Sequence, residues 1–201
     1  MRIFLKFISY VFHPILIPIA GTLAYFLITP RFSPPEFQSS NILPIFILTV
    51  IIPIIAYLIL KNLGLLSAIS MPTTKERKYP YAISIVLLFM IIYKVIPNNY
   101  TAELYYYFIG LVAATFTSLL LLFLNFKSSM HLMGMGSLLM FLVSLSIHFE
   151  INIIIALSLF VLATGIVATS RLYLKAHQKS EVIIGFLIGL LTQLFTIKYW
   201  L

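Results

Sequence analysis

A stretch of twelve residues near the end of the chain, from Ser170 to Glu181, holds side chains that could carry out phosphoryl transfer. It places Arg171, His177 and Glu181 between two long apolar segments. Polar groups next to hydrocarbon are costly, so such a cluster indicates a functional site. A guanidinium holds phosphate oxygens in a fork, and a carboxylate can orient and activate an imidazole as a nucleophile. Because His177 and Glu181 are four residues apart, they share one face of a helix.

Two further polar clusters precede this stretch. Lys75, Arg77 and Lys78 place three cations in four residues, which suits an anion or, alternatively, a positive flank that orients the neighbouring helices. Ser129 and His131 lie near a predicted helix start, where free N–H groups favour an anion; the alternative is an N-cap serine beside an interfacial histidine. A phosphate ester needs cations for its oxygens, a nucleophile in line and an acid opposite it. The three clusters together offer these groups.

The composition indicates that membrane helices position these clusters. The 201 residues are 62% hydrophobic and 9% charged, whereas soluble domains carry roughly 25% charged residues. Apolar runs approach or exceed the roughly 18–20 residues that cross a bilayer. The sequence therefore predicts an all-α fold, a polytopic transmembrane bundle of six or seven spans that forms a single integral membrane domain over residues 1–201. The predicted apolar segments are 7–29, 41–62, 80–97, 103–125, 132–148, 151–169 and 182–200, and residues 30–40, rich in Pro and Ser, are predicted to form a loop.

The net charge of +8 has a different meaning in a membrane protein than in a soluble one. It indicates anionic headgroups, a phosphate-bearing substrate or topology signals, and no nucleic-acid partner is expected. If all seven segments cross, the amino terminus and the three polar clusters share one face, which carries 10 of the 13 Lys and Arg residues. The positive-inside rule places that face in the cytoplasm.

The third cluster resembles a motif of the type-2 phosphatidic acid phosphatase superfamily. Ser170-Arg171, five residues, His177, three residues, Glu181 is similar to the family's third motif, Ser-Arg, five residues, His, three residues, Asp. The resemblance implies a metal-independent phosphatase with a covalent phosphohistidine intermediate. By position, His177 is implied as the nucleophile, Arg171 as a phosphate ligand, and Glu181, in place of the family's Asp, as the group that holds and polarises His177.

The two earlier clusters resemble the remaining motifs less closely. The run from Ser128 to His131 is similar to the second motif, Pro-Ser-Gly-His, with its Ser and His at Ser129 and His131. The first motif, a Lys followed after six residues by Arg-Pro, has a counterpart of different spacing at Lys75 and Arg77. The resemblance implies that His131 protonates the leaving alkoxide, that Ser129 donates a hydrogen bond to the phosphate, and that Lys75 or Arg77 adds to phosphate binding.

The residues and the resemblance predict an enzyme that hydrolyses a lipid or isoprenoid phosphate in the membrane without a metal or other cofactor. The expected partners are a lipid or polyprenyl phosphate and membrane lipids, and the expected location is the cell (inner) membrane, with multiple passes. The charge count favours a site on the cytoplasmic face, whereas the resemblance favours the outer face. Three alternatives stay open: a lipid phosphotransferase, an inactive protein that binds anionic lipid, and a small transporter that uses Arg171 and His177.

Polar and small residues outside the three clusters are expected to serve packing. His13, inside the first segment, is interpreted as a helix-packing or interfacial histidine. His148 and Glu150 are interpreted as an interfacial turn on the opposite face. Gly185 and Gly189 continue the face of His177 as a small-xxx-small pattern, which predicts close packing of the last helix.

Overall fold

The computed structural model describes residues 1–67, 71, 73–96 and 101–201, and within them every regular element is helical. Seven helical stretches are long and apolar enough to cross a membrane, in agreement with the predicted all-α bundle. They are Arg2–Ile28, Pro35–Asn62, Thr74–Val95, Ala102–Phe123, Met130–His148, Ile154–Tyr173 and Lys179–Ile197. The third and fifth, which look short in the sequence, are 22 and 19 residues long because each begins earlier than its apolar run.

Three of the seven stretches are composite. The first consists of α1 (Arg2–Val11), the 3-10 turn η1 (Pro14–Leu16) and α2 (Ile17–Ile28). The second consists of α3 (Pro35–Phe46), the π-helical turn η2 (Ile47–Ile51) and α4 (Ile52–Asn62), and the third of α5 (Thr74–Met90) and the π-helical turn η3 (Ile91–Val95). The other four are α6 (Ala102–Phe123), α7 (Met130–His148), α8 (Ile154–Tyr173) and α9 (Lys179–Ile197).

The structure corrects several predicted boundaries. Residues 35–40, predicted as loop, already belong to α3, because Pro35 occupies the first helical position, where a missing N–H is tolerated. Arg77 lies in the first turn of α5, and Arg171 in the last turn of α8, although both were expected in connections. The predicted end of the third segment at residue 97 lies outside the described residues.

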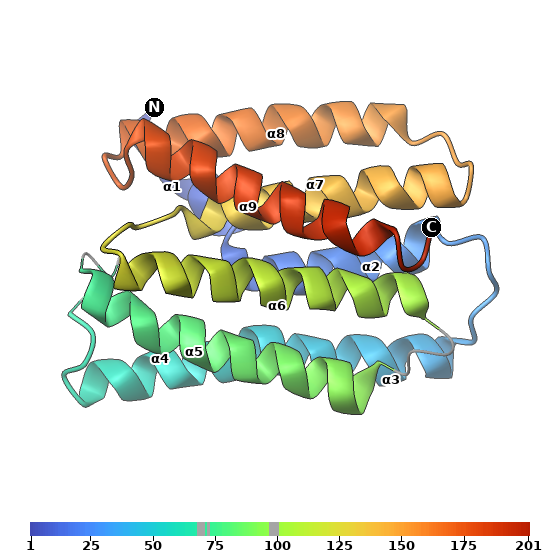
Figure 1. Cartoon of the computed structure of the whole chain (residues 1–201), viewed down its shortest axis with the longest axis horizontal. Coiled ribbons are helices and arrows are strands. Elements are labelled where there is room, and N and C mark those ends of the chain that lie inside the picture. Colours follow the sequence, from blue (N-terminus) through green and yellow to red (C-terminus); the bar gives the residue numbers. More distant parts are fainter. Residues whose placement is uncertain (68–70, 72, 97–100) are drawn as a thin grey trace.

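The helices run side by side, with α6 between the group α3, α4 and α5 and the group α7, α8 and α9 (Figure 1). The connections α4–α5, α6–α7 and α8–α9 lie at one end of the bundle together with the amino terminus (Figure 1). We call this the site end, because it carries all three polar clusters. This arrangement agrees with the count of crossings made from the sequence.

Proline residues interrupt the first two composite stretches. The chain bends at Phe12 and His13, just before Pro14, and the Nδ1 atom of His13 accepts the N–H of Ile15 at 3.3 Å. In the second stretch the π-helical turn ends two residues before Pro53, which cannot donate to the preceding turn. Such bulges widen a helix locally and occur frequently at functional sites. Both interruptions face the cavity described below.

Helices α7 and α9 pack closely at the site end, as the small-xxx-small pattern predicts. A Cβ atom on Gly185 would lie 2.6 Å from the carbonyl oxygen of Ser129, and one on Gly189 would overlap the carbonyl group of Met133. The N–H of Ser129 donates to the carbonyl oxygen of Glu181 at 2.9 Å. The second and third polar clusters are thereby held together through backbone.

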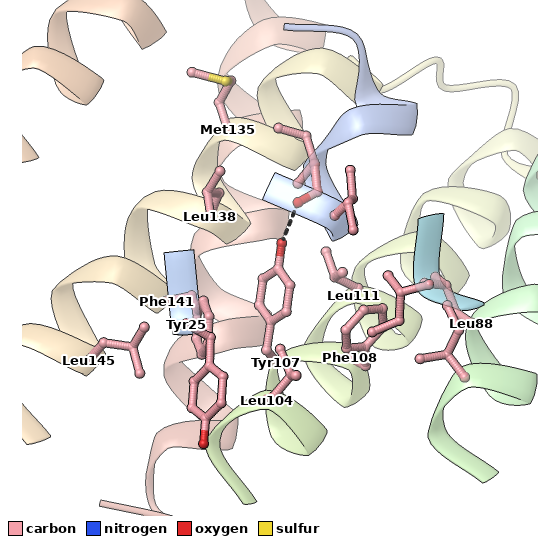
Figure 2. Close-up of a cluster of buried hydrophobic side chains, with 14 of the residues drawn as sticks. Tyr25, Leu88, Leu104, Tyr107, Phe108, Leu111, Met135, Leu138, Phe141 and Leu145 are labelled. Atoms are coloured by element: carbon pink, nitrogen blue, oxygen red, sulfur yellow. Dashed lines mark hydrogen bonds between the residues drawn. The ribbon is translucent and has the colours of Figure 1, made fainter. Parts of the chain in front are cut away.

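An aromatic centre fixes α2 against α6 and α7. The ring of Tyr107 stacks on Phe141 with 4.2 Å between centroids, and its hydroxyl donates to the carbonyl oxygen of Ile17 at 2.9 Å (Figure 2). At the opposite end of the bundle the carboxylate of Glu103 lies 3.1 Å from Arg31 and 3.3 Å from His148. His148, expected in an interfacial turn, therefore contacts the buried carboxylate of Glu103, as the more exposed Arg31 also does.

Candidate active site

A cavity of about 510 Å³ lies at the site end and extends between the helices. Members of all three polar clusters line it, namely Arg77 from α5, His131 from α7, Arg171 from α8 and His177 from the α8–α9 connection. The remainder of its wall is largely apolar and comes from α1, η1, α2, η2, α4, α5, α6 and α7. Residues up to 100 positions apart in the chain are therefore brought to one end of a single hollow.

The imidazole of His177 is held by Glu181. Its Nδ1 atom lies 2.7 Å from Oε2 of the carboxylate, which also accepts the N–H of Gln178 at 3.2 Å. Gln178 and Glu181 form a reciprocal capping box at the start of α9, so the carboxylate is fixed by the helix start itself. Because a carboxylate accepts, Nδ1 carries the hydrogen, and the lone pair of neutral His177 is on Nε2. That is the tautomer a nucleophile requires.

The surroundings of His177 keep its ring neutral. Only 8% of the residue is exposed. Burial lowers the pKa of His177 to about 4; the hydrogen bond to Glu181 opposes this effect, and the charges of Arg77 and Arg171 add to it. At neutral pH the ring therefore presents an unprotonated nitrogen next to two guanidinium groups.

Arg171 is oriented by the amino-terminal helix. Its Nη1 atom donates to the hydroxyl of Ser9 in α1 at 3.2 Å. The Ser9 hydroxyl lies 2.7 Å from that of Ser170, which in turn donates to the carbonyl oxygen of Leu5 at 2.7 Å. The Nε atom of Arg171 is buried and has no hydrogen-bond partner among the described residues.

Arg77 lines the cavity from α5, whereas Arg171 lines it from α8. Thr73 caps α5 by accepting the N–H of Glu76 at 3.3 Å, and this start places Arg77 in the first turn, facing inward. Its Nε atom donates to the carbonyl oxygen of Met71 at 2.9 Å, and only 8% of the residue is exposed. Lys75, two positions earlier, is exposed and does not line the cavity. Of the two cations considered in the first cluster, the structure brings Arg77 to the site.

His131 and Ser129 have different environments although they are two residues apart. The Nε2 atom of His131 lies 3.1 Å from the carbonyl oxygen of Ser9, so Nε2 carries a hydrogen and Nδ1 remains for other contacts. Ser129 is fully buried against α9, its hydroxyl has no hydrogen-bond partner among the described residues, and it is not part of the cavity wall. The structure thus groups His131, and not Ser129, with the other site residues.

Two residues of the amino-terminal stretch belong to this region and were missed by sequence reasoning. His13 lines the cavity, and its ring meets that of His131 edge to face, with 5.4 Å between centroids. Ser9 connects Arg171 to His131 through its hydroxyl and carbonyl groups. A histidine inside an apolar segment is itself a signal of a site, whereas a serine in α1 carries no such signal.

A second, polar pocket of about 340 Å³ lies on the Glu181 side of His177. Lys127 and Lys175 line it together with Gln178. His177 therefore separates a largely apolar cavity from a cationic one. Among the described residues, no group of three or more His, Asp or Glu side chains is arranged to hold a metal ion.

Comparisons with models of known protein families, with curated proteins and with solved structures found no match.

Proposed function

We propose that this protein is a membrane-embedded phosphatase that hydrolyses a lipid or isoprenoid phosphate through a phosphohistidine on His177. The observation that carries the proposal is one cavity with two guanidinium groups and imidazoles at one end and apolar walls along the rest. A phosphate ester with a long hydrocarbon chain likewise has a charged end and an apolar remainder. The cavity therefore suits such a lipid phosphate better than a small polar ester.

Phosphate binding is assigned to Arg77 and Arg171. Guanidinium groups bind phosphate oxygens through directed, charge-assisted hydrogen bonds, and both groups are near enough to His177 to affect its pKa. Together they neutralise a dianionic headgroup and place its phosphorus next to Nε2. Positioning and charge stabilisation provide most of the catalysis in phosphoryl transfer.

The reaction proceeds in two displacements. The Nε2 lone pair of His177 attacks phosphorus, an N–P bond forms, and the P–O bond to the alkyl group breaks. His131 enters this step as an imidazolium that the bound phosphate dianion stabilises, and the departing oxygen takes the proton from its Nδ1, the atom not bonded to Ser9. Water then gives a proton back to His131 while its oxygen attacks phosphorus and the N–P bond breaks. The products are the alcohol and inorganic phosphate.

The apolar part of the cavity is assigned to the hydrocarbon chain. Its wall includes Arg77 and Leu88, which are 11 residues apart on α5, or about 16 Å along a helix. That is about half of the roughly 30 Å hydrocarbon core. Leu48 in the π-helical turn and Ile54, shortly after it, line the same space. The chain of a substrate can therefore remain in an apolar environment while its phosphate is bound at the site end.

The resemblance to the type-2 phosphatidic acid phosphatase superfamily supports the same assignment. Its third motif corresponds to Arg171, His177 and Glu181, and the 2.7 Å contact between His177 and Glu181 suits a carboxylate that polarises the nucleophile. We propose that the protein acts in the cell membrane and crosses it seven times.

The proposal is tested with the purified protein in detergent. Phosphate release is measured from phosphatidic acid, a polyprenyl diphosphate and glycerol 3-phosphate, with His177→Ala as control and thermal unfolding to verify its fold. We expect release from at least one of the two long-chain substrates, little from glycerol 3-phosphate and none from the folded variant. A protein that binds phosphatidic acid vesicles and releases no phosphate from either lipid would instead be the lipid-binding alternative.

A further inference from the structure

His13 occupies a position at the site that belongs to none of the three clusters. It lies at the bend between α1 and η1, four residues after Ser9, and lines the cavity. Ser9 contacts both Arg171 and His131, so the amino-terminal stretch provides a fourth side of the site. The bend before Pro14 turns His13 toward this side.

The hydrogen bonding of His13 defines which of its nitrogens is available. The Nδ1 atom accepts the N–H of Ile15 at 3.3 Å, so the hydrogen of the neutral ring is on Nε2. Among the described residues no protein group bonds to Nε2. The ring therefore presents one donor at the cavity wall.

The position of His13 relative to His131 indicates which part of a substrate this donor meets. In an in-line displacement the leaving oxygen is on the side of phosphorus opposite the nucleophile. The proposed function assigns that side to His131. The rings of His13 and His131 are in edge-to-face contact, with an angle of 79° between their planes. Because of this contact, His13 lies on the leaving-group side as well.

We propose that His13 is a further substrate-binding residue of this site, which donates a hydrogen bond from Nε2 to the leaving oxygen of the phosphate ester. After the alcohol departs, the same N–H holds the oxygen of the attacking water, whose proton passes to His131. This inference rests on the proposed function and adds to it a residue outside the sequence motifs.

Two variants separate this role from the structural role of His13. The amide oxygen of Asn at this position can accept the N–H of Ile15, but the side chain is too short to put a donor where Nε2 of His13 lies. The longer Gln side chain places its amide NH₂ near that position. We expect His13→Asn to lower kcat/KM by about 10- to 100-fold, the effect of one hydrogen bond to a charged group, and His13→Gln to remain within about 3-fold of wild type. Wild-type activity in His13→Asn would contradict the proposal and leave His13 only the role of accepting the N–H of Ile15. Equal losses of activity in both variants would contradict a donor role.

Chemical modification of the wild-type protein tests the same role of His13 without a substitution. Diethyl pyrocarbonate modifies exposed imidazoles, and mass spectrometry measures its attachment to His13. We expect orthovanadate, a phosphate analogue, to protect His13, while His148 at the opposite end is unaffected. Protection without any lipid phosphatase activity would uphold the binding role while the proposed function fails. Activity without protection of His13 would overturn the inference alone.

Discussion

At the scale of the residue, the contact between His177 and Glu181 makes the length of the acidic side chain decisive. The carboxylate reaches Nδ1 at 2.7 Å and is fixed by the capping box of α9. In aspartate, which is one methylene shorter, the carboxylate would lie too far from Nδ1 of His177 for a good hydrogen bond. The sequence alone leaves open whether glutamate can replace aspartate here, whereas the geometry shows a glutamate that fits.

We therefore predict that Glu181→Asp lowers kcat by about 10- to 100-fold, since a displacement of about 1 Å can cost about 100-fold in rate. Glu181→Gln is the matched control, because it retains the length and removes the charge. Initial rates of phosphate release measure both. An aspartate variant as fast as wild type would show that the carboxylate does not orient His177.

The lowered pKa of His177 also predicts a dependence of stability on pH. Burial first, and then the charges of the two arginines, lower the pKa of His177 to about 4, although the hydrogen bond to Glu181 opposes this effect. In the unfolded chain the same imidazole titrates near 6.5. Between these values the unfolded chain binds a proton that the folded protein does not, so the free energy of unfolding falls as the pH drops through this window. His177→Asn should lose less thermal stability between pH 7 and pH 4.5 than wild type. An equal loss would place the titrating group elsewhere.

At the scale of the element, the close approach of α7 and α9 holds the second and third clusters together. A side chain on Gly189 would overlap the backbone of Met133, which cannot yield as a flexible side chain would. Gly165 in α8 provides a matched control, because nothing lies within 4 Å of an added Cβ.

Gly189→Ala is expected to destabilise the protein by about 1–3 kcal/mol through overpacking. Gly165→Ala should leave stability unchanged or raise it by up to about 1 kcal/mol, the difference in helix propensity. Thermal unfolding in one detergent compares the two variants. If both behave alike, the approach of α7 to α9 is not as close as described.

The sequence predicts helices well and their ends less well, for physical reasons. Hydrophobic runs define the part of a helix that borders hydrocarbon, but α5 and α8 extend by one or two turns into polar residues such as Arg77 and Arg171. The pairing of His177 with Glu181 follows from helical spacing. The roles of Ser9 and His13 do not, because the sequence of the amino-terminal stretch does not reveal that α1 packs on α8 or that both residues contact His131.

At the scale of the whole molecule, the site end carries an excess of positive charge that the cavity does not explain. Only Arg77 and Arg171 of its ten Lys and Arg residues line the main cavity. Without them eight cations remain at this end, against three at the other. By the positive-inside rule we therefore predict that the site end faces the cytoplasm.

The chain contains no cysteine, so single cysteines report its topology without a background. We predict that Ser180→Cys at the site end is not labelled by a membrane-impermeant maleimide in intact cells, whereas Asn152→Cys at the other end is. Both should react after the cells are lysed. The reverse pattern would place the site on the outer face, as the family resemblance favours.

The proposed mechanism requires a covalent bond between His177 and the phosphoryl group of the substrate. A lipid phosphate with a radioactive phosphorus, mixed briefly with the protein and quenched in alkali, tests this bond, because phosphohistidine survives alkali and is lost in acid. We expect acid-labile label on the wild-type chain, mapped to the peptide with residue 177, and none on folded His177→Ala. Label that persists in the variant, or phosphate release by wild type with no label at all, would contradict the mechanism.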